Sequence, residues 1–563
     1  MGGYFITNSN NVKFEEKIIN FFSQQDMIKY TKIFLKPFTL YYFHKINVAN
    51  INHIYKNGSD YIVGVGVFFY KGKFGYEALQ CIYENIQQNG LTNIFNDIQG
   101  HFNFIIYLEN ELYIVTDKTG TYHSYCSLKG GTFFGSSSFY SILEVLDNMT
   151  VNKQELMEFM MFETYIGENT PIKEVQFLKF GHIHHFNKNY EYKLIPYFRE
   201  KFIDTHINIH NIYESIKNYF KIFINLNNTI TLELSAGYDT RLIYAIFRNM
   251  NLKYILNTNE NSSDPSDKNI PIEIAKKEKD KIFVFNKVPD INNSLDLINN
   301  SLIRNELIRD NFGGRYSYVF LSEKTKNFDM VIGGYGGELY RDVKYQGIKD
   351  MYDLISKQYL DKTFSSISSK KDILSFKNNL IKKWQKFLGK KSNKLNKVEC
   401  EKIYYFLKMM YWGGSRITYF NRYGYRFHPL LDYELIYKLF YIGNNEKTDH
   451  RFMMKTIKNF DRSIASHKSN YGYNFIWDEN KRSSYKNLRK INLCKKTILN
   501  NLNKKYIKLT QKEVSWRKLL EKDMIIKKYI GDKIDSIDME NKKLGRIFTI
   551  EYFLERYNDK ILA

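Results

Sequence analysis

The stretch Thr231–Arg241, TLELSAGYDTR, is an apolar strand followed by a turn of small residues, and Leu242–Met250 continues it as a helix. The turn offers the hydroxyl groups of Ser235 and Thr240, backbone N–H groups and the positive end of a helix to an anion, while Asp239 adds a carboxylate for a metal ion. It therefore predicts a phosphate or pyrophosphate site. The Gly-Lys-Ser/Thr of a Walker loop and the Gly-x-Gly-x-x-Gly of a dinucleotide fold are both missing. Taken alone, the stretch also fits a strand–turn–helix junction with ordinary turn residues.

A second stretch of the same kind is Phe328–Leu339, FDMVIGGYGGEL, in which a short apolar strand ends in a glycine-rich turn. Glycines allow a backbone to approach a nucleotide closely, and Glu338 can bind Mg²⁺ from across a crevice. A glycine turn after a strand is common, so this stretch alone is a weak signal. Its combination with the first stretch is much stronger.

The segments between these two turns alternate between strand and helix patterns. Leu252–Thr258 and Lys281–Phe285 are apolar and strand-like, and Asp267–Lys277 between them fits a helix. This alternation predicts a doubly wound parallel sheet. Because the carboxyl ends of parallel strands meet at one edge, Asn257 and Thr258 should lie beside Ser235.

Residues 1–195 are instead dominated by strands. Tyr61–Tyr70 is an apolar run, and Phe102–Tyr107 with Leu112–Thr116 forms a predicted hairpin around Glu109-Asn110. Residues 350–410 are rich in lysine and helical in pattern. The segment from Ser483 onward is also helical in pattern; the residues expected to be buried there are Trp516, Leu519, Leu520 and Ile547–Phe553.

Composition indicates a globular chain of two or three domains, with 563 residues, 43% hydrophobic residues and a net charge of +23. Lysine is spread along the chain, so a coding bias explains the charge better than nucleic-acid binding, and no nucleic-acid module is recognisable. The four cysteines are far apart, and neither a signal peptide nor a membrane span is apparent. We therefore expect a cytoplasmic protein. The alternating His182, His184 and His185 are expected to serve packing rather than a metal.

The order of these motifs resembles the asparagine synthetase-like family. In its glutaminase domain, the matching segments are Asp97–Phe104, Thr116–Gly120, Phe134–Ser137, Thr170–Ile172 and Leu178–His182. In its synthetase domain, the matching segments are the two turns above, Arg416–Asp432 and the loop around Lys468. The resemblance implies an Ntn-type αββα sandwich over residues 1–195. It also implies a doubly wound synthetase domain of the ATP-pyrophosphatase type, with helical elaborations, over residues 205–563.

The family's nucleotide site, carried over to this sequence, implies ATP and Mg²⁺ as cofactors. Residues implied to bind ATP or pyrophosphate are Leu234, Ser235, Gly237, Asp239, Thr240, Asn257, Thr258, Gly333 and Gly334. The implied metal ligands are Asp239 and Glu338, where Glu338 replaces the family's Asp. Lys468 would stabilise charge on the leaving group.

Three departures from the family pattern concern chemistry. Gly2 stands where an active glutaminase has its cysteine nucleophile, so no thioester can form and this domain is predicted to be catalytically silent. Tyr335 matches the β-lactam synthetase branch, in which a Tyr/Glu pair deprotonates the attacking amine; a tyrosine that merely lines the wall is the alternative. Tyr425 and Phe427 replace the Glu and Arg of the family segment, which leaves the carboxylate partner of Tyr335 unassigned.

The resemblance implies an ATP-dependent carbon–nitrogen ligase that adenylates a carboxylate and transfers the acyl group to an amine. The partners expected are a carboxylate-bearing small molecule or peptide and an amine donor, with no membrane or nucleic acid. A homodimer is a further option. Alternatives are ammonia-dependent amidation of an amino acid or sugar acid, and a non-catalytic scaffold. Nucleic-acid modification by adenylation is compatible with the charge but has no RNA-binding module to support it.

Overall fold

The computed structural model describes most of the chain. The described residues are 2–47, 52–200, 209–259, 266–285, 302–304, 306–307, 328–341, 345, 347–476, 478, 484, 487–488, 491, 524–530 and 541–562. The expected buried positions Trp516, Leu519 and Leu520 lie outside them. In this part of the chain, no helix is both long and apolar enough to cross a membrane.

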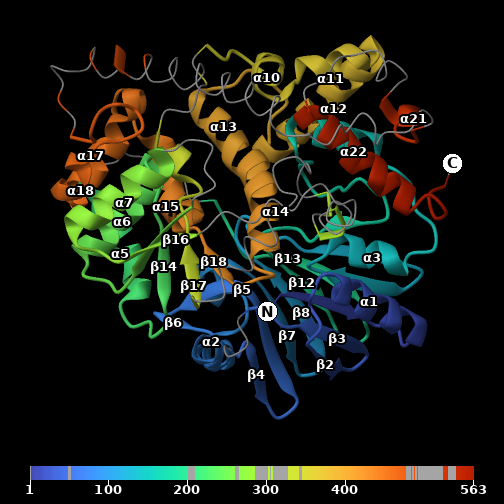
Figure 1. Cartoon of the computed structure of the whole chain (residues 1–563). Coiled ribbons are helices and arrows are strands. Elements are labelled where there is room, and N and C mark those ends of the chain that lie inside the picture. The colour runs from blue at the N-terminus through green and yellow to red at the C-terminus, as the bar shows by residue number, and fades with distance from the viewer. Residues whose placement is uncertain are drawn as a thin grey trace.

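Two antiparallel sheets occupy the N-terminal part (Figure 1). The first sheet has the order β11-β9-β10-β1-β3-β2, and its strands are Gly3–Thr7 (β1), Tyr30–Leu35 (β2), Phe38–Phe43 (β3), Tyr125–Lys129 (β9), Thr132–Ser136 (β10) and Gln176–Phe177 (β11). The second has the order β13-β12-β8-β7-β5-β4, with β6 paired to β5. Its strands are Ile54–Asn57 (β4), Asp60–Tyr70 (β5), Lys73–Phe74 (β6), Gln99–Leu108 (β7), Glu111–Thr116 (β8), His182–Phe186 (β12) and Tyr192–Pro196 (β13).

Alternating side chains of these strands bury apolar surface on both faces of each sheet. Ile6 and Val65 belong to one cluster between the two sheets. On the outer face of the first sheet, Phe5 packs with helices Val12–Gln24 (α1) and Phe139–Val145 (α3). Helix Tyr76–Asn89 (α2) covers the outer face of the second sheet through Leu79 and Ile82. The predicted hairpin is present as β7 and β8, which pair from Asn103–Thr116 to Leu108–Glu111.

A third sheet is entirely parallel, with the order β16-β15-β14-β17-β18. Its strands are Ile230–Glu233 (β14), Ile255–Asn259 (β15), Ile282–Phe285 (β16), Met330–Ile332 (β17) and Tyr425–Phe427 (β18). The helices between and beside them include Ile209–Phe220 (α5), Tyr238–Asn249 (α6), Ser266–Glu278 (α7), Arg451–Phe460 (α17) and Arg462–Ser466 (α18). The predicted α/β class with a parallel sheet is therefore confirmed. Strand order reverses between β14 and β17, which is where ligands bind in open α/β sheets.

The remaining helices span the space above both parts (Figure 1). They are Lys153–Phe162 (α4), Met351–Leu354 (α10), Lys362–Ile367 (α11), Lys370–Leu388 (α12), Lys397–Lys402 (α13), Met410–Phe420 (α14), Tyr433–Ile436 (α15), Asn444–Lys447 (α16), Lys527–Ile530 (α21) and Asn541–Arg556 (α22). A π-helical segment, Ile403–Met409 (η5), joins α13 to α14. Shorter helical turns are Ile94–Asn96 (η1), Lys221–Phe223 (η2), Gly337–Tyr340 (η3), Ile355–Tyr359 (η4), Pro429–Leu431 (η6), Tyr437–Tyr441 (η7) and Thr448–His450 (η8).

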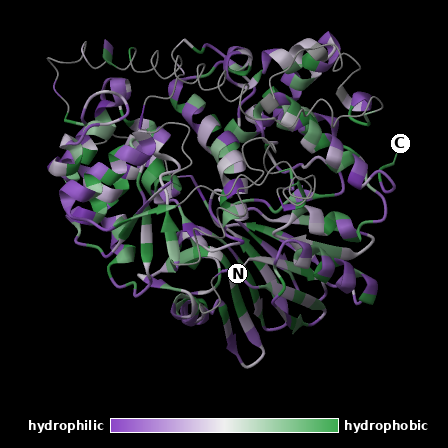
Figure 2. Cartoon of the chain, viewed as in Figure 1, coloured by the Kyte–Doolittle hydropathy of each residue, from purple (hydrophilic) through white to green (hydrophobic). Residues whose placement is uncertain are grey.

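Helix α12 shows how sequence fixes these elements. The Ser369 side chain accepts a hydrogen bond from Asp372 N–H at its start, and Gly389 ends it in the left-handed conformation with φ 64°. Apolar side chains at helical spacing, including Trp384, bury one face. Trp384 shares a core with α4 and α22, where Ile547, Ile550 and Phe553 are buried as expected. In Figure 2 the apolar residues likewise concentrate in the strands and on the inner helix faces.

Candidate functional site

The Thr231–Arg241 turn joins β14 to α6 as the sequence predicted, and its own side chains hold it in shape. Ser235 N–H donates to Thr240 Oγ1 at 3.0 Å, and the two hydroxyl oxygens are also 3.0 Å apart. Gly237, the residue before α6, donates its N–H to Ser235 Oγ at 3.3 Å. The residues predicted to bind pyrophosphate are therefore already gathered at the start of a helix, where N–H groups favour an anion.

The glycine-rich turn after β17 closes against this first turn. A β-carbon at Gly337 would lie 2.3 Å from Asp239 Cγ, and one at Gly334 would lie 3.0 Å from Thr240 N. Only glycine permits the approach at Gly337, because real β-carbon contacts are longer. Gly333 donates its N–H to Phe427 O at 3.0 Å, which ties the turn to β18. The two stretches singled out in the sequence thus form one site.

Asp239 and Glu338, the predicted metal ligands, lie close enough to interact electrostatically. Burial raises the pKa of Asp239 to about 6, Arg341 opposes that rise and Glu338 adds to it. Arg341 Nη2 is 2.8 Å from Asp239 Oδ2, whereas the buried Oδ1 has no hydrogen-bond partner among the described residues. Tyr404 donates its hydroxyl to Glu338 Oε1 at 3.4 Å. Two carboxylates with an uncommitted buried oxygen fit Mg²⁺, which uses one or two carboxylates and completes its shell with phosphate and water.

Arg241 is a buried cation directly beneath the first turn, and sequence reasoning gave it no role. Its side chain is fully buried and donates to three carbonyl oxygens, of Ala236 at 3.3 Å, His467 at 2.9 Å and Lys468 at 3.0 Å. Its guanidinium lies 4.5 Å from the ring centre of Phe475, and no carboxylate pairs with it in the described part of the chain. Burial lowers its pKa to about 9, so the group stays charged at neutral pH.

Because Arg241 holds the carbonyl of Lys468, it fixes the backbone of the loop predicted to carry the pyrophosphate-binding lysine. The Lys468 side chain itself is exposed.

Asn257 and Thr258 lie beneath the turn, since Leu234 N–H donates to Asn257 O at 2.8 Å. The Asn257 amide donates to Thr231 Oγ1 at 2.8 Å and Thr258 Oγ1 to Asp267 O at 3.0 Å, so both side chains bond within the protein.

Tyr335 packs against an imidazole and an indole rather than a carboxylate. Its ring centre is 4.8 Å from that of His428 and 6.0 Å from that of Trp412. Its hydroxyl makes no hydrogen bond within the described residues. His428 Nε2 is 3.2 Å from Arg426 Nε, and burial together with Arg426 holds the His428 pKa well below its usual range. Tyr335 therefore faces a neutral imidazole.

Arg426 in turn binds both carboxylate oxygens of Glu233, at 2.8 and 2.7 Å, at the carboxyl end of β14. The sequence comparison had matched Tyr425 and Phe427 to the family's Glu and Arg, yet these side chains point away from the site. Tyr425 lies against His53 and Phe427 against Phe69. Successive strand residues face opposite sides, so the polar residues of β18 are those one position further along.

Gly2, where a glutaminase has its nucleophile, is enclosed. Its N–H donates to Phe43 O at 2.9 Å. A β-carbon here would lie 2.8 Å from both His44 O and Met27 Sδ, and 3.2 Å from Arg422 O. Arg422 comes from the turn after α14 and forms a buried ion pair with Glu306, with Nη2 and Oε1 2.7 Å apart. The side chain of a nucleophile has no room at this position.

The three histidines of β12 make contacts within the N-terminal sheets. His182 Nδ1 is 2.7 Å from Phe180 O, His184 Nδ1 is 2.8 Å from Tyr192 Oη, and His185 Nε2 is 2.8 Å from Glu111 Oε2. Over the described ranges, no group of three or more His, Cys, Asp or Glu side chains is arranged to hold a metal ion. A metal at Asp239 and Glu338 would therefore need further ligands from phosphate and water.

Comparison with known proteins gives matches among the solved structures, two of them at 9% sequence identity. No family model and no curated protein matches the chain. One solved structure is described as the allosteric regulatory enzyme of purine biosynthesis; it is 9% identical at a TM-score of 0.23, over 46% of this chain and 66% of that one. Another is glutamine phosphoribosylpyrophosphate amidotransferase from B. subtilis complexed with ADP and GMP, 9% identical at a TM-score of 0.23, over 52% of this chain and 69% of that one. A TM-score of 0.23 is too low to show a shared fold.

Proposed function

We propose that this protein forms amide bonds by adenylating a substrate carboxylate with ATP and transferring the acyl group to an amine. The observation that carries the proposal is the closure of the glycine turn onto Asp239, at the point where the order of the parallel strands reverses. It agrees with the resemblance to the asparagine synthetase-like family, whose ATP-pyrophosphatase domain has loops of these types in this order. The N-terminal sheets would then be a silent relative of the family's glutaminase domain.

The first chemical step joins the acid to AMP. A carboxylate oxygen of the substrate attacks the α-phosphorus of ATP, the bond to the bridging α,β oxygen breaks and pyrophosphate leaves. The N–H groups at the start of α6 and the Ser235 and Thr240 hydroxyls would hold the departing phosphates, and Arg241 and Lys468 would offset their charge. Mg²⁺ bound by Asp239 and Glu338 would supply further neutralisation of the phosphates.

The second step consumes the acyl adenylate. The amine nitrogen attacks the acyl carbon, loses a proton and displaces AMP. Tyr335 would relay that proton, its oxygen taking the proton of the amine while the phenol's own proton passes to water. Gly2 provides no thiol and no space for one, which argues against ammonia from glutamine hydrolysis in this chain as the nitrogen source. An amine carried by the acyl substrate or by a second substrate is the simplest donor, as in β-lactam or macrolactam formation; free ammonia is the other source.

ATP–pyrophosphate exchange with a pool of candidate acids and peptides tests the proposal. Asp239→Asn should reduce exchange at least about 100-fold, because a ligand to magnesium and phosphate is lost. Tyr335→Phe should leave exchange intact but slow amide formation, since only the second step needs the phenol. Asp353→Asn is the matched control. Asp353 is an acid on α10 that pairs with Lys357, so this change should affect neither exchange nor amide formation.

One observation favours a non-catalytic scaffold as the second candidate. Arg341 occupies Asp239 Oδ2 at 2.8 Å, so a guanidinium stands where the metal would bind. For the enzyme, Arg341 must share Asp239 with Mg²⁺ or turn toward the phosphates. If calorimetry detects no binding of Mg·ATP to the wild type or to Arg341→Ala, and no acid supports exchange, the scaffold replaces the enzyme.

A further inference from the structure

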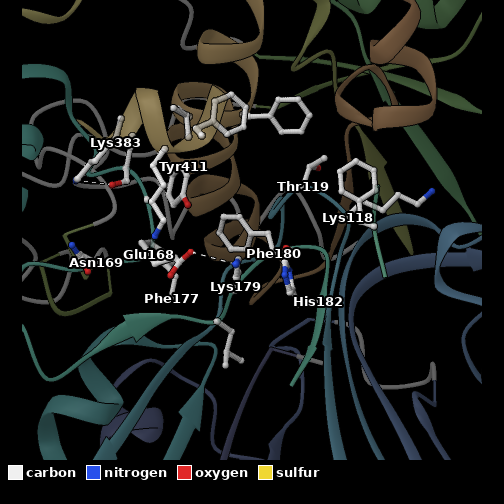
Figure 3. Close-up of a pocket in the computed structure, with 18 of the residues that line it drawn as sticks. Lys118, Thr119, Glu168, Asn169, Phe177, Lys179, Phe180, His182, Lys383 and Tyr411 are labelled. Atoms are coloured by element: carbon white, nitrogen blue, oxygen red, sulfur yellow. Dashed lines mark hydrogen bonds and ion pairs between the residues drawn. The ribbon is translucent and has the colours of Figure 1, made fainter. Parts of the chain in front are cut away.

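A cavity of about 720 Å³ lies apart from the predicted nucleotide site, between the N-terminal sheets and the helices above them (Figure 3). It is lined by the turn after β8, by the segment linking β11 to β12, by α12 and by η5 and α14. This volume is within the range of cavities that bind small molecules. No role described above uses it.

Six aromatic rings form part of its wall. The rings are those of Phe177, Phe180, Phe198, Phe387, Phe406 and Tyr411. Three of these rings pack together. The ring centres of Phe177 and Phe180 are 5.9 Å apart, and each is 5.3 Å from the ring centre of Tyr411. Behind them His123 stacks on Phe180 and its Nε2 lies 3.0 Å from Met410 O. The wall is thus braced from behind. Phe177 and Tyr411 are themselves buried, and Phe180 is half-buried at the cavity.

Ion pairs neutralise several of the charged groups at the cavity. Lys118 pairs with Glu434 at 3.2 Å, and Lys179 lies 3.9 Å from Glu168. Lys383 is held by two buried carboxylates of α4, Glu155 at 2.9 Å and Glu158 at 2.6 Å. Each of these lysines is therefore paired with at least one carboxylate, and Lys383 is paired with two.

Lys382 and Lys386 are different. They lie four residues apart on α12, line the cavity and are exposed. Neither ammonium has an ion pair or hydrogen bond within the described residues. The cavity therefore combines an aromatic wall with two uncompensated positive charges, and this combination attracts a ligand that is apolar at one end and negative at the other.

We propose that this cavity binds an amphipathic anion, a molecule with an aromatic or aliphatic body and a carboxylate, sulfonate or phosphate end. The body packs on half-buried rings of the wall, such as Phe180 and Phe406, and the anionic end meets Lys382 and Lys386. The site is separate from the adenylation site proposed above. It is nevertheless connected to it, because η5 contributes Phe406 to the cavity and Tyr404 to Glu338.

Titration calorimetry of the full chain with 1-naphthaleneacetate and its uncharged amide tests the proposal. The acid should bind at least about tenfold more tightly than the amide. The double variant Lys382→Glu/Lys386→Glu should weaken the acid about tenfold and leave the amide unchanged. Lys371→Glu inverts another exposed charge of α12 outside the cavity and should have no effect.

A second variant locates the ligand. Leu407→Trp puts an indole into the cavity and should abolish binding of both probes; its fold is checked by circular dichroism, and if it does not fold the charge variants decide alone. Saturating Mg·ATP should not displace the acid. The proposal is wrong if neither probe binds, if the double variant binds the acid as wild type does, or if Mg·ATP competes with it.

Discussion

The surroundings of Gly2 and those of the Thr231–Arg241 turn differ in how their buried charges are matched. Near Gly2, Arg422 pairs with Glu306 at 2.7 Å, and the space for a side chain is filled. Beneath the turn, and within the described structure, Arg241 donates hydrogen bonds only to carbonyl oxygens, and Asp239 keeps an unpartnered Oδ1. Buried groups without partners cost stability, so they persist where a ligand completes them. The comparison indicates a structural role for the first region and supports the proposed binding site in the second.

The two buried arginines test this contrast most directly. Arg422→Met leaves Glu306 buried without its counter-ion and should lower the free energy of unfolding by about 3–5 kcal/mol. Arg241→Met leaves only carbonyl groups without their partner, and should lower the free energy of unfolding by about 1–3 kcal/mol. It should also weaken pyrophosphate binding. Urea denaturation measures the free energy of unfolding of both variants.

The double variant Arg422→Met/Glu306→Leu is the control for the charge argument. It should recover much of the lost stability, because the isolated carboxylate is gone. Equal losses for the two single arginine variants, with no recovery in the double variant, would contradict the difference in pairing.

The glycine turn gives the next largest effect. Gly337→Ala places a β-carbon 2.3 Å from Asp239 Cγ, so the two turns must separate. We expect affinity for Mg·ATP to fall about 100-fold, as happens when binding groups are displaced by an ångström. Calorimetry measures the change. Gly443→Ala, at a position where a β-carbon meets nothing within 4 Å, is the control and should bind as wild type does.

The sequence predicted the parallel sheet and the two turns because both signals are local. An apolar strand ending in Ser-x-Gly-x-Asp-Thr sets its own geometry, and alternation of strands with helices sets the sheet class. The hydroxyls of Ser235 and Thr240 are therefore where they were expected. The roles assigned to Lys468 and Tyr335 stay predictions.

The remaining parts of the site come from long-range packing. Arg341 and Arg426 meet acids 102 and 193 residues away in the chain, and no local pattern announces such pairs. The motif match assigned Tyr425 and Phe427 of β18 to the site. A match displaced by one residue along a strand selects the opposite face, and the polar residues at the site are Arg426 and His428. Gly2 is enclosed by His44, Met27 and Arg422, which are distant in the chain, so no local sequence pattern could predict this enclosure.

The enclosed Gly2 gives a smaller and purely structural effect. Gly2→Cys should not create glutaminase activity, measured as glutamate released from glutamine, because its β-carbon has no space. Overpacking of this kind should lower the free energy of unfolding by about 1–3 kcal/mol. Gly2→Ala should cost nearly the same, since the clash arises at the β-carbon. Any glutamate release by Gly2→Cys above that of Gly2→Ala would show that the region can reopen.

The smallest predicted effect of a single residue is a loss of stability at acidic pH. His101, His123 and His184 are buried in the N-terminal sheets, and burial lowers their pKa to about 3, about 4 and about 4. Between these values and the ordinary pKa near 6.5, the unfolded chain binds protons that the folded chain does not, so stability is lost as pH falls. From pH 7.5 to pH 5.5 each histidine should remove about 1.4 kcal/mol from the free energy of unfolding.

Urea denaturation of His184→Gln at the two pH values isolates one of these contributions. The variant should lose about 1.4 kcal/mol less than wild type on acidification, because glutamine does not titrate. Ile183→Val, a buried change beside it on β12, should shift stability equally at both pH values. An unchanged pH dependence in His184→Gln would mean that this histidine is protonated in the folded chain, and the N-terminal sheets would then not be the tightly closed scaffold that the comparison with the Thr231–Arg241 turn requires.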